Sequence, residues 1–409
     1  MNNIVCFLVT EHPFLDARIF KKEAKSLVKK GYKVTMIVPR KNGYLFDVDG
    51  NLFRNEFRDS TFYYEGIKII TYEQINYEQN LKELHYTLLS RGYNRFNDSL
   101  TCLGIKQEAD FYHTHELFSL YSGIGIKRAL TSKGKHCKLI YDSHELEPDP
   151  LSNQSNSVKK VKKSMLNIML RELDFVITVS ESIKSWYLSI NSTLSVEVIY
   201  NSPPLASICE SKKGNESSLV LGYEGDIGRN RGTFKKLINV LEMCNKSFYL
   251  RAKIIGGCKK SKQDSILEVP SHLRDKISFT GWVDYDSIPL EMKDVDLGWI
   301  DLDATNSLNN KYAMPNKFFS YLNNGVPVLV NNCEDMERFI LSYNCGYVIN
   351  KLQASALDYH QALIHLESDR KKINEMSRNA REIMKTEYNW GYMENRLYAV
   401  YDQLNNSGA

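Results

Sequence analysis

Residues 315–328, PNKFFSYLNNGVPV, decide the fold. A proline suits the first turn of a helix because its φ is fixed. Phe318, Tyr321 and Leu322 follow at the spacing of one apolar helix face, and the Asn-Gly pair after them predicts the helix end. Residues 326–330 then predict a short buried strand. The stretch therefore has the form of a helix-to-strand corner in a parallel sheet.

The first turn of this helix also has the chemistry of an anion-binding site. Asn316 and Lys317 combine free backbone N–H groups, the positive end of the helix dipole and a lysine charge. An ordinary helix-to-strand corner, with Lys317 as a plain surface lysine, accounts for the same residues. The rest of the chain has to distinguish the two interpretations.

Length and composition predict a multidomain globular protein. The chain has 409 residues, too many for one compact core, and 43% of them are hydrophobic and 25% charged. The net charge of +4 is too small to indicate nucleic-acid binding. The eight cysteines form no CxxC pair and lack zinc spacing, which predicts reduced core cysteines. The N-terminus reads as a strand rather than a signal peptide, and no apolar run approaches ~18 residues, so we expect a cytoplasmic protein.

Strand and helix patterns alternate twice along the chain, on either side of a polar linker at residues 206–217. Two such series predict an α/β protein with two doubly wound, Rossmann-like domains. We expect these domains at 1–205 and 206–388, with a C-terminal helix at 389–409.

The first βαβ unit has strands at 4–10 and 32–38 around a helix at 16–30, whose Lys and Arg side chains are expected to face solvent. Residues 41–66 show no period and predict an irregular loop. Further strands are expected at 67–71, 110–113, 138–141, 175–179, 196–200, 219–223, 249–255, 277–280, 295–300 and 346–349. Further helices are expected at 76–106, 117–130, 155–173, from 181, and at 233–244, 288–293, 353–368, 370–385 and 390–404.

The distinctive polar and glycine residues all follow the carboxyl ends of predicted strands. In doubly wound sheets ligands bind beyond those ends. We therefore predict a ligand-binding cleft between the two domains. The residues concerned are His113, His115, His144, Glu145, Ser180, Asn201, residues 225–232, Gly256, Gly281, Asn316 and Lys317.

Several segments, in this order and spacing, resemble a known family. They are DARIFKKEAKSLVKKGYKVTMI, DFYHTHELFSLYSG, LIYDSHELEPD, DFVITVSESIKSWYL, VEVIYNSP, LGYEGDIGRNRGTFKKLI, ISFTGWVDYDSIPLEMKDVDLGWI and PNKFFSYLNNGVPVLV. Together they resemble retaining glycosyltransferases of the GT-B fold, family 4, of the polysaccharide, O-antigen and capsule type. The resemblance covers nearly the whole chain.

The resemblance implies an enzyme of surface polysaccharide or lipopolysaccharide biosynthesis. It would transfer a sugar from a UDP- or GDP-sugar to a glycan or to a polyprenyl-linked saccharide, without a cofactor or a metal. The resemblance also implies that the C-terminal helix crosses back to the first domain.

Donor binding would depend on cations near the diphosphate, because negative charge grows there as the glycosidic bond breaks. The resemblance places Arg231 where the family has a phosphate-binding lysine, and it places Asn316 and Lys317 on the same phosphates. Asp226 stands where the family usually has an arginine, and Arg229 is either its replacement or a solvated loop charge. The remaining residues implied for donor binding are Gly225, Gly232, Gly256, Gly281, Pro315 and Ser320.

The family's two hallmark glutamates are absent. Tyr312 stands at the first of these positions, and Ser320 at the second, which usually binds the ribose hydroxyls. A serine hydroxyl would reach the ribose through water. This departure motivates a second hypothesis, a catalytically silent GT-B protein that binds a glycan or a partner enzyme. A sugar-nucleotide epimerase ranks below both hypotheses.

His144 is the candidate catalytic residue of the first domain. The resemblance places it on the transferred sugar, in a same-face reaction in which the leaving phosphate helps to deprotonate the acceptor. A structural hydrogen bond to Asp142 or Glu145 is the alternative. The expected acceptor-side residues are Asp16, His113, His115, Glu145 and Ser180. The His113–His115 pair lacks a third ligand in the sequence, so we predict no metal site.

Two basic runs, 127–138 and 158–163, lie in the first domain. The second run precedes apolar residues at 165, 166, 168 and 169 on the same predicted helix. This pattern predicts peripheral contact with the anionic inner face of the cytoplasmic membrane. A solvated basic helix face is the alternative.

Overall fold

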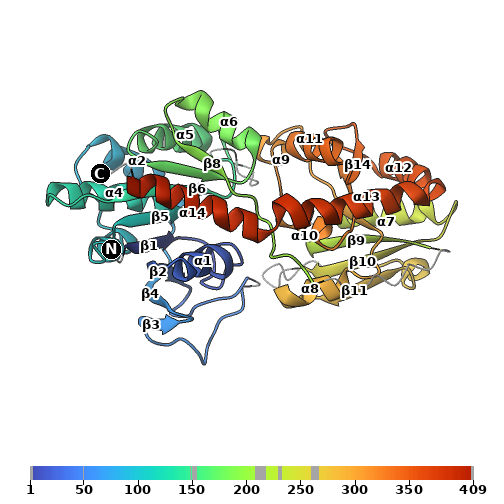
Figure 1. Ribbon diagram of the computed structural model, residues 1–409, viewed down its shortest axis with the longest axis horizontal. Coiled ribbons are helices and arrows are strands. Elements are labelled where there is room, and N and C mark those ends of the chain that lie inside the picture. The colour runs from blue at the N-terminus through green and yellow to red at the C-terminus, as the bar shows by residue number, and fades with distance from the viewer. Residues whose placement is uncertain are drawn as a thin grey trace. The chain divides into compact units, whose positions relative to one another are not determined.

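The chain folds into two α/β units in the computed structural model, which describes residues 3–48, 50–147, 149, 154–207, 218–228, 233–258 and 267–406. Unit 1 contains residues 1–200 and 394–409, and unit 2 contains residues 201–393. Each unit has its own sheet with helices packed on it (Figure 1).

Unit 1 is built on an eight-stranded sheet in the order β3-β4-β2-β1-β5-β6-β7-β8. Neighbouring strands are parallel except for the pair β3 and β4. The strands are β1 (Ile4–Val9), β2 (Lys33–Arg40), β3 (Thr61–Tyr64), β4 (Ile67–Glu73), β5 (Phe111–His115), β6 (Lys138–Ser143), β7 (Phe175–Thr178) and β8 (Val196–Val198).

Strand β3 corrects the expectation that residues 41–66 form only an irregular loop. β3 and β4 form an antiparallel hairpin whose two turn residues, Glu65 and Gly66, have φ values of 47° and 81°. Two positive φ angles match the twist of a tight hairpin, which makes the glycine useful at this turn.

The helices of unit 1 include a π-helical turn at Ile19–Ala24, which leads directly into α1. Arg18, Lys22 and Glu23 are buried here, so the expectation that the basic side chains of this helix all face solvent is wrong. The helices of unit 1 are α1 (Lys25–Lys29), α2 (Leu81–Leu89), α3 (Ser99–Ile105), α4 (Leu117–Ser132), α5 (Asn156–Met169) and α6 (Glu181–Ile190).

Unit 2 is built on a six-stranded sheet in the order β11-β10-β9-β12-β13-β14, with every pair parallel. The chain moves outward from β9 in one direction and then returns to β12 on its other side. The topological switch point of the sheet is therefore between β9 and β12. The strands are β9 (Leu219–Asp226), β10 (Leu250–Gly257), β11 (Ile277–Gly281), β12 (Leu297–Ile300), β13 (Val328–Asn331) and β14 (Gly346–Ile349).

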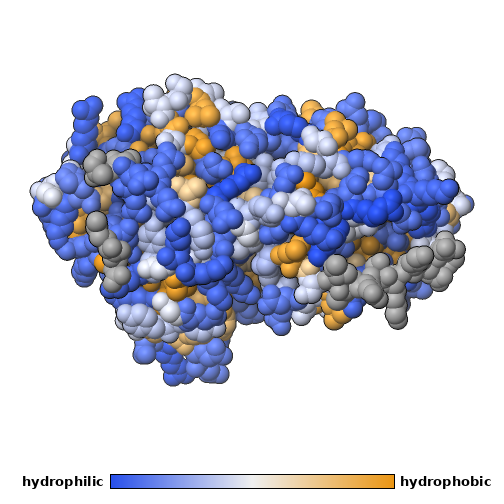
Figure 2. Space-filling model, in the orientation of Figure 1, coloured by the Kyte–Doolittle hydropathy of each residue, from blue (hydrophilic) through white to orange (hydrophobic). Residues whose placement is uncertain are grey.

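Residues 315–328 form the predicted helix and lead into the predicted strand. Pro315 is the N-cap residue of α10 (Asn316–Asn323), and β13 follows. The other helices are α7 (Thr233–Cys244), α8 (Ile288–Glu291), α9 (Leu308–Lys311), α11 (Glu334–Tyr343), α12 (Ala356–Ser368), α13 (Arg370–Ile383) and α14 (Trp390–Asn406). Helix α13 buries residues at i, i+3, i+7 and i+10, and its other face contributes to the hydrophilic surface in Figure 2.

The part of α14 from Glu394 onward belongs to unit 1 and packs on β5. The Tyr401 ring centroid lies 5.1 Å from that of Phe111, and the Tyr401 hydroxyl lies 2.9 Å from His113 Nδ1. Seven cysteines in the described ranges are free, and Cys102 is exposed rather than in the core. Among the helices of the described residues, none is long and apolar enough to cross a membrane.

Candidate active site

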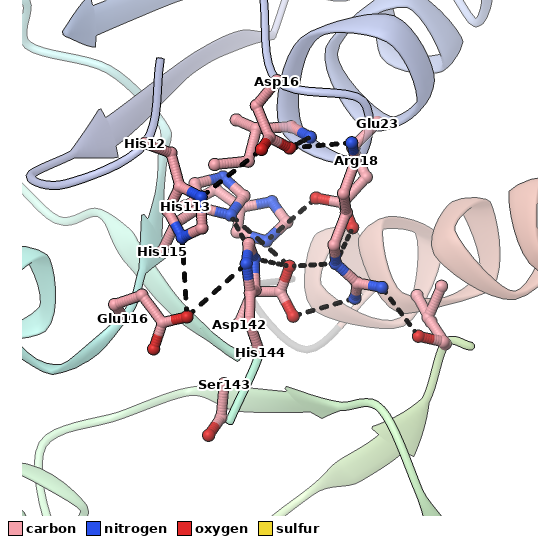
Figure 3. A network of polar contacts seen from close by, with 12 residues as sticks. His12, Asp16, Arg18, Glu23, His113, His115, Glu116, Asp142, Ser143 and His144 are labelled. Carbon is pink, nitrogen blue, oxygen red and sulfur yellow. Dashed lines mark hydrogen bonds and ion pairs between the residues drawn. The ribbon is translucent and has the colours of Figure 1, made fainter. Parts of the chain in front are cut away.

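Unit 1 gathers its titratable residues at the carboxyl ends of β1, β5 and β6 (Figure 3). These strands are neighbours in the sheet, and β1 and β5 flank its switch point. His12 follows β1, His115 and Glu116 end or follow β5, and Asp142 and His144 end or follow β6. The sheet topology thus brings together residues that are about 130 positions apart in sequence.

Arg18 and Asp142 form the buried centre of this cluster. The Arg18 side chain is 4% exposed and that of Asp142 is fully buried. Arg18 Nε and Nη2 donate to the two Asp142 oxygens at 2.9 Å each, and Arg18 Nη1 donates to the Ile199 carbonyl at 2.9 Å. Burial raises the pKa of Asp142, but Arg18 and the neighbouring histidines hold it well below its ordinary value. Asp142 is therefore a fixed negative charge.

His144 is held by this charge, as the structural alternative predicted. Its Nε2 lies 3.0 Å from Asp142 Oδ2 and 3.2 Å from His115 Nδ1, while its Nδ1 lies 3.5 Å from Glu116 Oε1. The His144 side chain is 9% exposed, so the ring is oriented but still reaches solvent. An imidazole oriented by a carboxylate can hold or pass a proton and can position a polar ligand.

Asp16 and His12 extend the cluster toward solvent. His12 Nδ1 lies 3.3 Å from Asp16 Oδ2, and His12 Nε2 lies 3.6 Å from Glu116 Oε1. Burial lowers the pKa of His12, but its contacts with both carboxylates raise it well above the ordinary value. Glu116 has a φ of 74°, a strained conformation that aims its side chain at both histidines. The sequence analysis missed His12, Arg18 and Glu116.

His113 and His115 are fully buried, and burial lowers the pKa of both, that of His115 to about 4. The expectation that this pair lacks further ligands is wrong, because Glu23 and Asp142 lie beside it. A second group, His12, Glu116 and His144, is partly exposed, and its ligand atoms lie within 4.8 Å of one another. Either group has the residue types that could hold a metal ion, although Arg18 already neutralises Asp142 in the first.

Two predicted acceptor-side residues lie outside these contacts. Ser180 is buried, and its hydroxyl accepts from the Ile183 N–H at 3.3 Å as the N-cap of α6. The Glu145 carbonyl accepts from the Ser143 hydroxyl at 2.6 Å. Both residues have clear structural roles here.

In unit 2 the backbone comes close together at the carboxyl ends of β9 and β10. Gly225 and Gly256 have φ values of 101° and 126°, and a Cβ on Gly256 would lie 2.5 Å from the Gly225 carbonyl oxygen. Side chains are excluded from this edge, so a ligand can approach the backbone directly. Gly281, at the end of β11, has a φ of 71° and open space around it.

Lys317 lies at the same edge of the sheet. Its Nζ is 3.9 Å from the Tyr223 ring centroid and 3.8 Å from the position that a Gly225 Cβ would take. Asn316 and Lys317 form the first turn of α10, where backbone N–H groups have no helical acceptor. The structure therefore brings together Gly225, Gly256, Asn316 and Lys317, all predicted for the donor site.

Glu224 is a further residue of this edge that the sequence analysis missed. Burial raises the pKa of its carboxyl group, and Ser320 and Lys317 lower it in part, so both side chains lie near it. Tyr312 ends the short helix α9 and its ring lies near Lys311 Nζ, at 5.7 Å. Arg229, Arg231 and Gly232 lie outside the described residues.

The basic runs of unit 1 are largely paired in the structure. Lys127 and Arg128 contact Asp174 and Glu172, and the buried Lys162 contacts Glu78 at 2.8 Å. Residues 165, 166 and 169 of α5 are buried in the domain, so the apolar face of this helix is a core face. The exposed basic residues that remain on α5 are compatible with the solvated-face alternative.

Solved structures with the same fold cover nearly the whole chain. Sucrose-phosphate synthase from Thermosynechococcus elongatus matches with a TM-score of 0.72 and 13% identity, over 99% of this chain and 100% of that one. Anabaena HepE in complex with UDP matches with a TM-score of 0.67 and 14% identity, over 98% and 100% of the two chains. The fold is GT-B. WaaG, a glycosyltransferase involved in lipopolysaccharide biosynthesis, has the same GT-B fold, with a TM-score of 0.60, 12% identity and coverage of 97% and 99%.

One family matches part of this GT-B chain. Residues 267–397 match the family described as glucosyltransferase 3-like, C-terminal domain. The match includes α10 with Lys317 and Ser320, but neither β9 nor its glycine-rich end. No curated protein sequence matches the chain.

Proposed function

We propose that this chain is a retaining glycosyltransferase of family 4 that transfers a sugar from a nucleotide-sugar donor. The observation that carries the proposal is the edge of the unit 2 sheet, where Lys317 and the first turn of α10 meet the glycine ends of β9 and β10. The match of residues 267–397 to a glucosyltransferase 3-like domain supports it. The neighbour HepE is described in complexes with UDP and with UDP-glucose, which makes a UDP-sugar the first donor to test.

The proposed donor site stabilises the leaving diphosphate. Backbone N–H groups at the start of α10 and the Lys317 ammonium group are fixed before the reaction begins. Such donors bind the developing negative charge more strongly than the ground state, and that difference accelerates bond cleavage. Gly225 and Gly256 leave the backbone accessible at this point.

In unit 1 the proposal gives His144 the role of orienting the transferred sugar. Asp142 and Glu116 face opposite nitrogens of its ring, so the ring is held in one orientation. Asp16 and His115 position this group rather than contact the acceptor, because each is hydrogen-bonded within the cluster. No external acid or base is needed if the departing phosphate takes the acceptor proton.

The proposed acceptor is a glycan or a polyprenyl-linked saccharide in surface polysaccharide synthesis, at the inner face of the cytoplasmic membrane. Tyr86 and Leu89 on α2 are 60% and 56% exposed, and α2 packs beside the basic helix α5 through a 2.8 Å contact between His85 and Ser164. An exposed aromatic and aliphatic pair beside lysines suits an anionic lipid surface. Sedimentation with vesicles with and without anionic lipid tests this part; equal binding would contradict it.

The experiment that tests the function is a transfer assay with purified chain and a panel of UDP-, GDP- and ADP-sugars. We expect titration calorimetry to detect at least one donor and Arg231→Ala to abolish transfer while the thermal unfolding transition stays unchanged. Absence of binding to every donor, or unchanged turnover in Arg231→Ala, would contradict the proposal.

A second candidate is a catalytically silent GT-B protein that binds a glycan or a partner enzyme. Ser320 and Tyr312 at the two expected glutamate positions favour it. Activity that requires a partner protein and survives Arg231→Ala would favour this alternative. Donor hydrolysis by the purified chain alone would exclude it.

A further inference from the structure

Glu224 is an acidic residue at a position where a diphosphate site is expected to be basic. It lies at the carboxyl end of β9, next to Gly225 and at the switch point of the unit 2 sheet. Ligands of doubly wound sheets bind at this point. Ser320, one α10 turn beyond Lys317, is close to the same carboxyl group.

The backbone of Glu224 is fixed by α10. Its N–H donates to the Tyr321 hydroxyl at 2.8 Å, and that hydroxyl donates to the Gly222 carbonyl at 3.1 Å. Tyr321 is fully buried, and Gly222 and Gly298 are neighbours across β9 and β12. A Cβ on Gly298 would lie 2.3 Å from the Tyr321 ring, so the glycine is what admits this ring. The position of Glu224 is therefore set by packing rather than by its own side chain.

The Glu224 carboxyl group has an unused acceptor. Its Oε2 atom is inaccessible to solvent and has no hydrogen-bond donor among the residues that the structure describes. Burial raises the pKa of Glu224, which shows that ionisation at this position is costly. A buried acceptor without a donor destabilises a protein, so its retention is explained if a ligand supplies the donor.

The surroundings limit the chemistry of that ligand. A phosphate would be repelled by the carboxylate, whereas neutral hydroxyls would donate to it. Lys317 is the cation for a phosphate at the same edge. A pocket of about 300 Å³ adjoins Glu224: Ser320 and Tyr285 line it, and burial followed by the Glu224 charge raises the pKa of Tyr285. A ligand with both phosphates and paired hydroxyls fits, and the ribose diol of a nucleoside diphosphate has that chemistry.

We propose that the Glu224 carboxylate accepts hydrogen bonds from the ribose 2′- and 3′-hydroxyls of the nucleotide donor. This inference rests on the proposed function. It assigns to a residue of β9 the contact that Ser320 on α10 is too short to make directly. Ser320 then orients the carboxylate, and Lys317 balances its charge.

The test compares nucleotide binding to the full chain by titration calorimetry. The probes are whichever of UDP, GDP and ADP binds most tightly and its 2′,3′-dideoxy form. The variants are Glu224→Gln and, as a matched control in the same unit, Glu242→Gln, whose side chain is 41% exposed. We expect wild type and the control to bind the dideoxy form about tenfold more weakly than the ribose form. Glu224→Gln should lose about tenfold for the ribose form and discriminate little between the two.

A second readout separates function from folding. Glu224→Gln without nucleotide should unfold at the same or a higher temperature, because it removes a buried ionisable carboxyl group. Wild-type affinity should rise with pH as Glu224 ionises, and the variant should lack this rise. If wild type binds nucleotide but does not distinguish the dideoxy form, or Glu224→Gln binds as wild type does, the inference is overturned alone. If wild type binds no nucleotide, the proposed function fails with it.

Discussion

In unit 1, the polar cluster satisfies itself: Asp142 accepts from Arg18 on one side and faces His144 and His115 on the other. In unit 2, the corresponding strand ends bear glycines, one lysine and a glutamate with an unused oxygen. Both sets lie at the switch point of a parallel sheet. The difference indicates a preorganised group in unit 1 and a site completed by its ligand in unit 2.

The largest effect is expected from breaking the buried pair of unit 1. Arg18→Met leaves Asp142 as a buried, uncompensated charge, which should lower the free energy of unfolding by about 3–5 kcal/mol. Arg338→Met is the matched control, because Arg338 is 55% exposed and pairs with Glu334 at 3.2 Å. The control should change stability by less than about 1 kcal/mol. Equal losses in urea unfolding would show that the pair in unit 1 is not a preorganised element.

The next effect sharpens the comparison from unit 2. Gly256→Ala introduces a Cβ 2.5 Å from the Gly225 carbonyl oxygen at a φ of 126°, so the ends of β9 and β10 must separate. We expect a loss of about 1–3 kcal/mol in unfolding free energy and a marked loss of nucleotide affinity. Gly281→Ala, with a φ of 71° and open space, should cost only about 1 kcal/mol. Intact nucleotide binding in Gly256→Ala would place the ligand elsewhere.

The smallest effect is the pH dependence of unit 1. Because the pKa of His12 in the folded chain is raised above its ordinary value of 6.5, its contacts with Asp16 and Glu116 are fully present below pH 6.5. They are lost as pH rises through the raised pKa, which should lower stability by about 1 kcal/mol or more. His12→Gln should remove this slope, whereas His272→Gln, whose side chain is 64% exposed, should retain it. Identical pH profiles of unfolding in all three proteins would contradict the assigned contacts.

Much of the fold could be predicted because strand and helix periods are local properties. The helix at 233–244 and the helix and strand that follow Pro315 lie where the sequence places them. Strand β3 was missed because the pattern before its Glu-Gly turn is too short to show a period. Helix α11 was missed although Met336, Phe339 and Ile340 are spaced as a buried helix face.

The site was less predictable because burial of charge is a tertiary property. Arg18 lies in a run of basic residues and gives no sign that it pairs with Asp142, which is 124 positions away. Glu224 lies in a strand, and only the packing of Tyr321 shows why its carboxyl group is confined. The histidines and glycines were found because these residue types are distinctive at strand ends.

Nucleotide binding by a lysine pair tests the central claim most directly. Lys317 and Lys311 lie six residues apart in unit 2, on α10 and α9, and Lys311 faces Glu334 at 3.6 Å. Titration calorimetry with the nucleoside diphosphate that wild type binds best should show an affinity about tenfold lower, or lower still, for Lys317→Ala and unchanged for Lys311→Ala. If Lys317→Ala binds as tightly as wild type, the diphosphate does not bind at the start of α10 and the account is wrong.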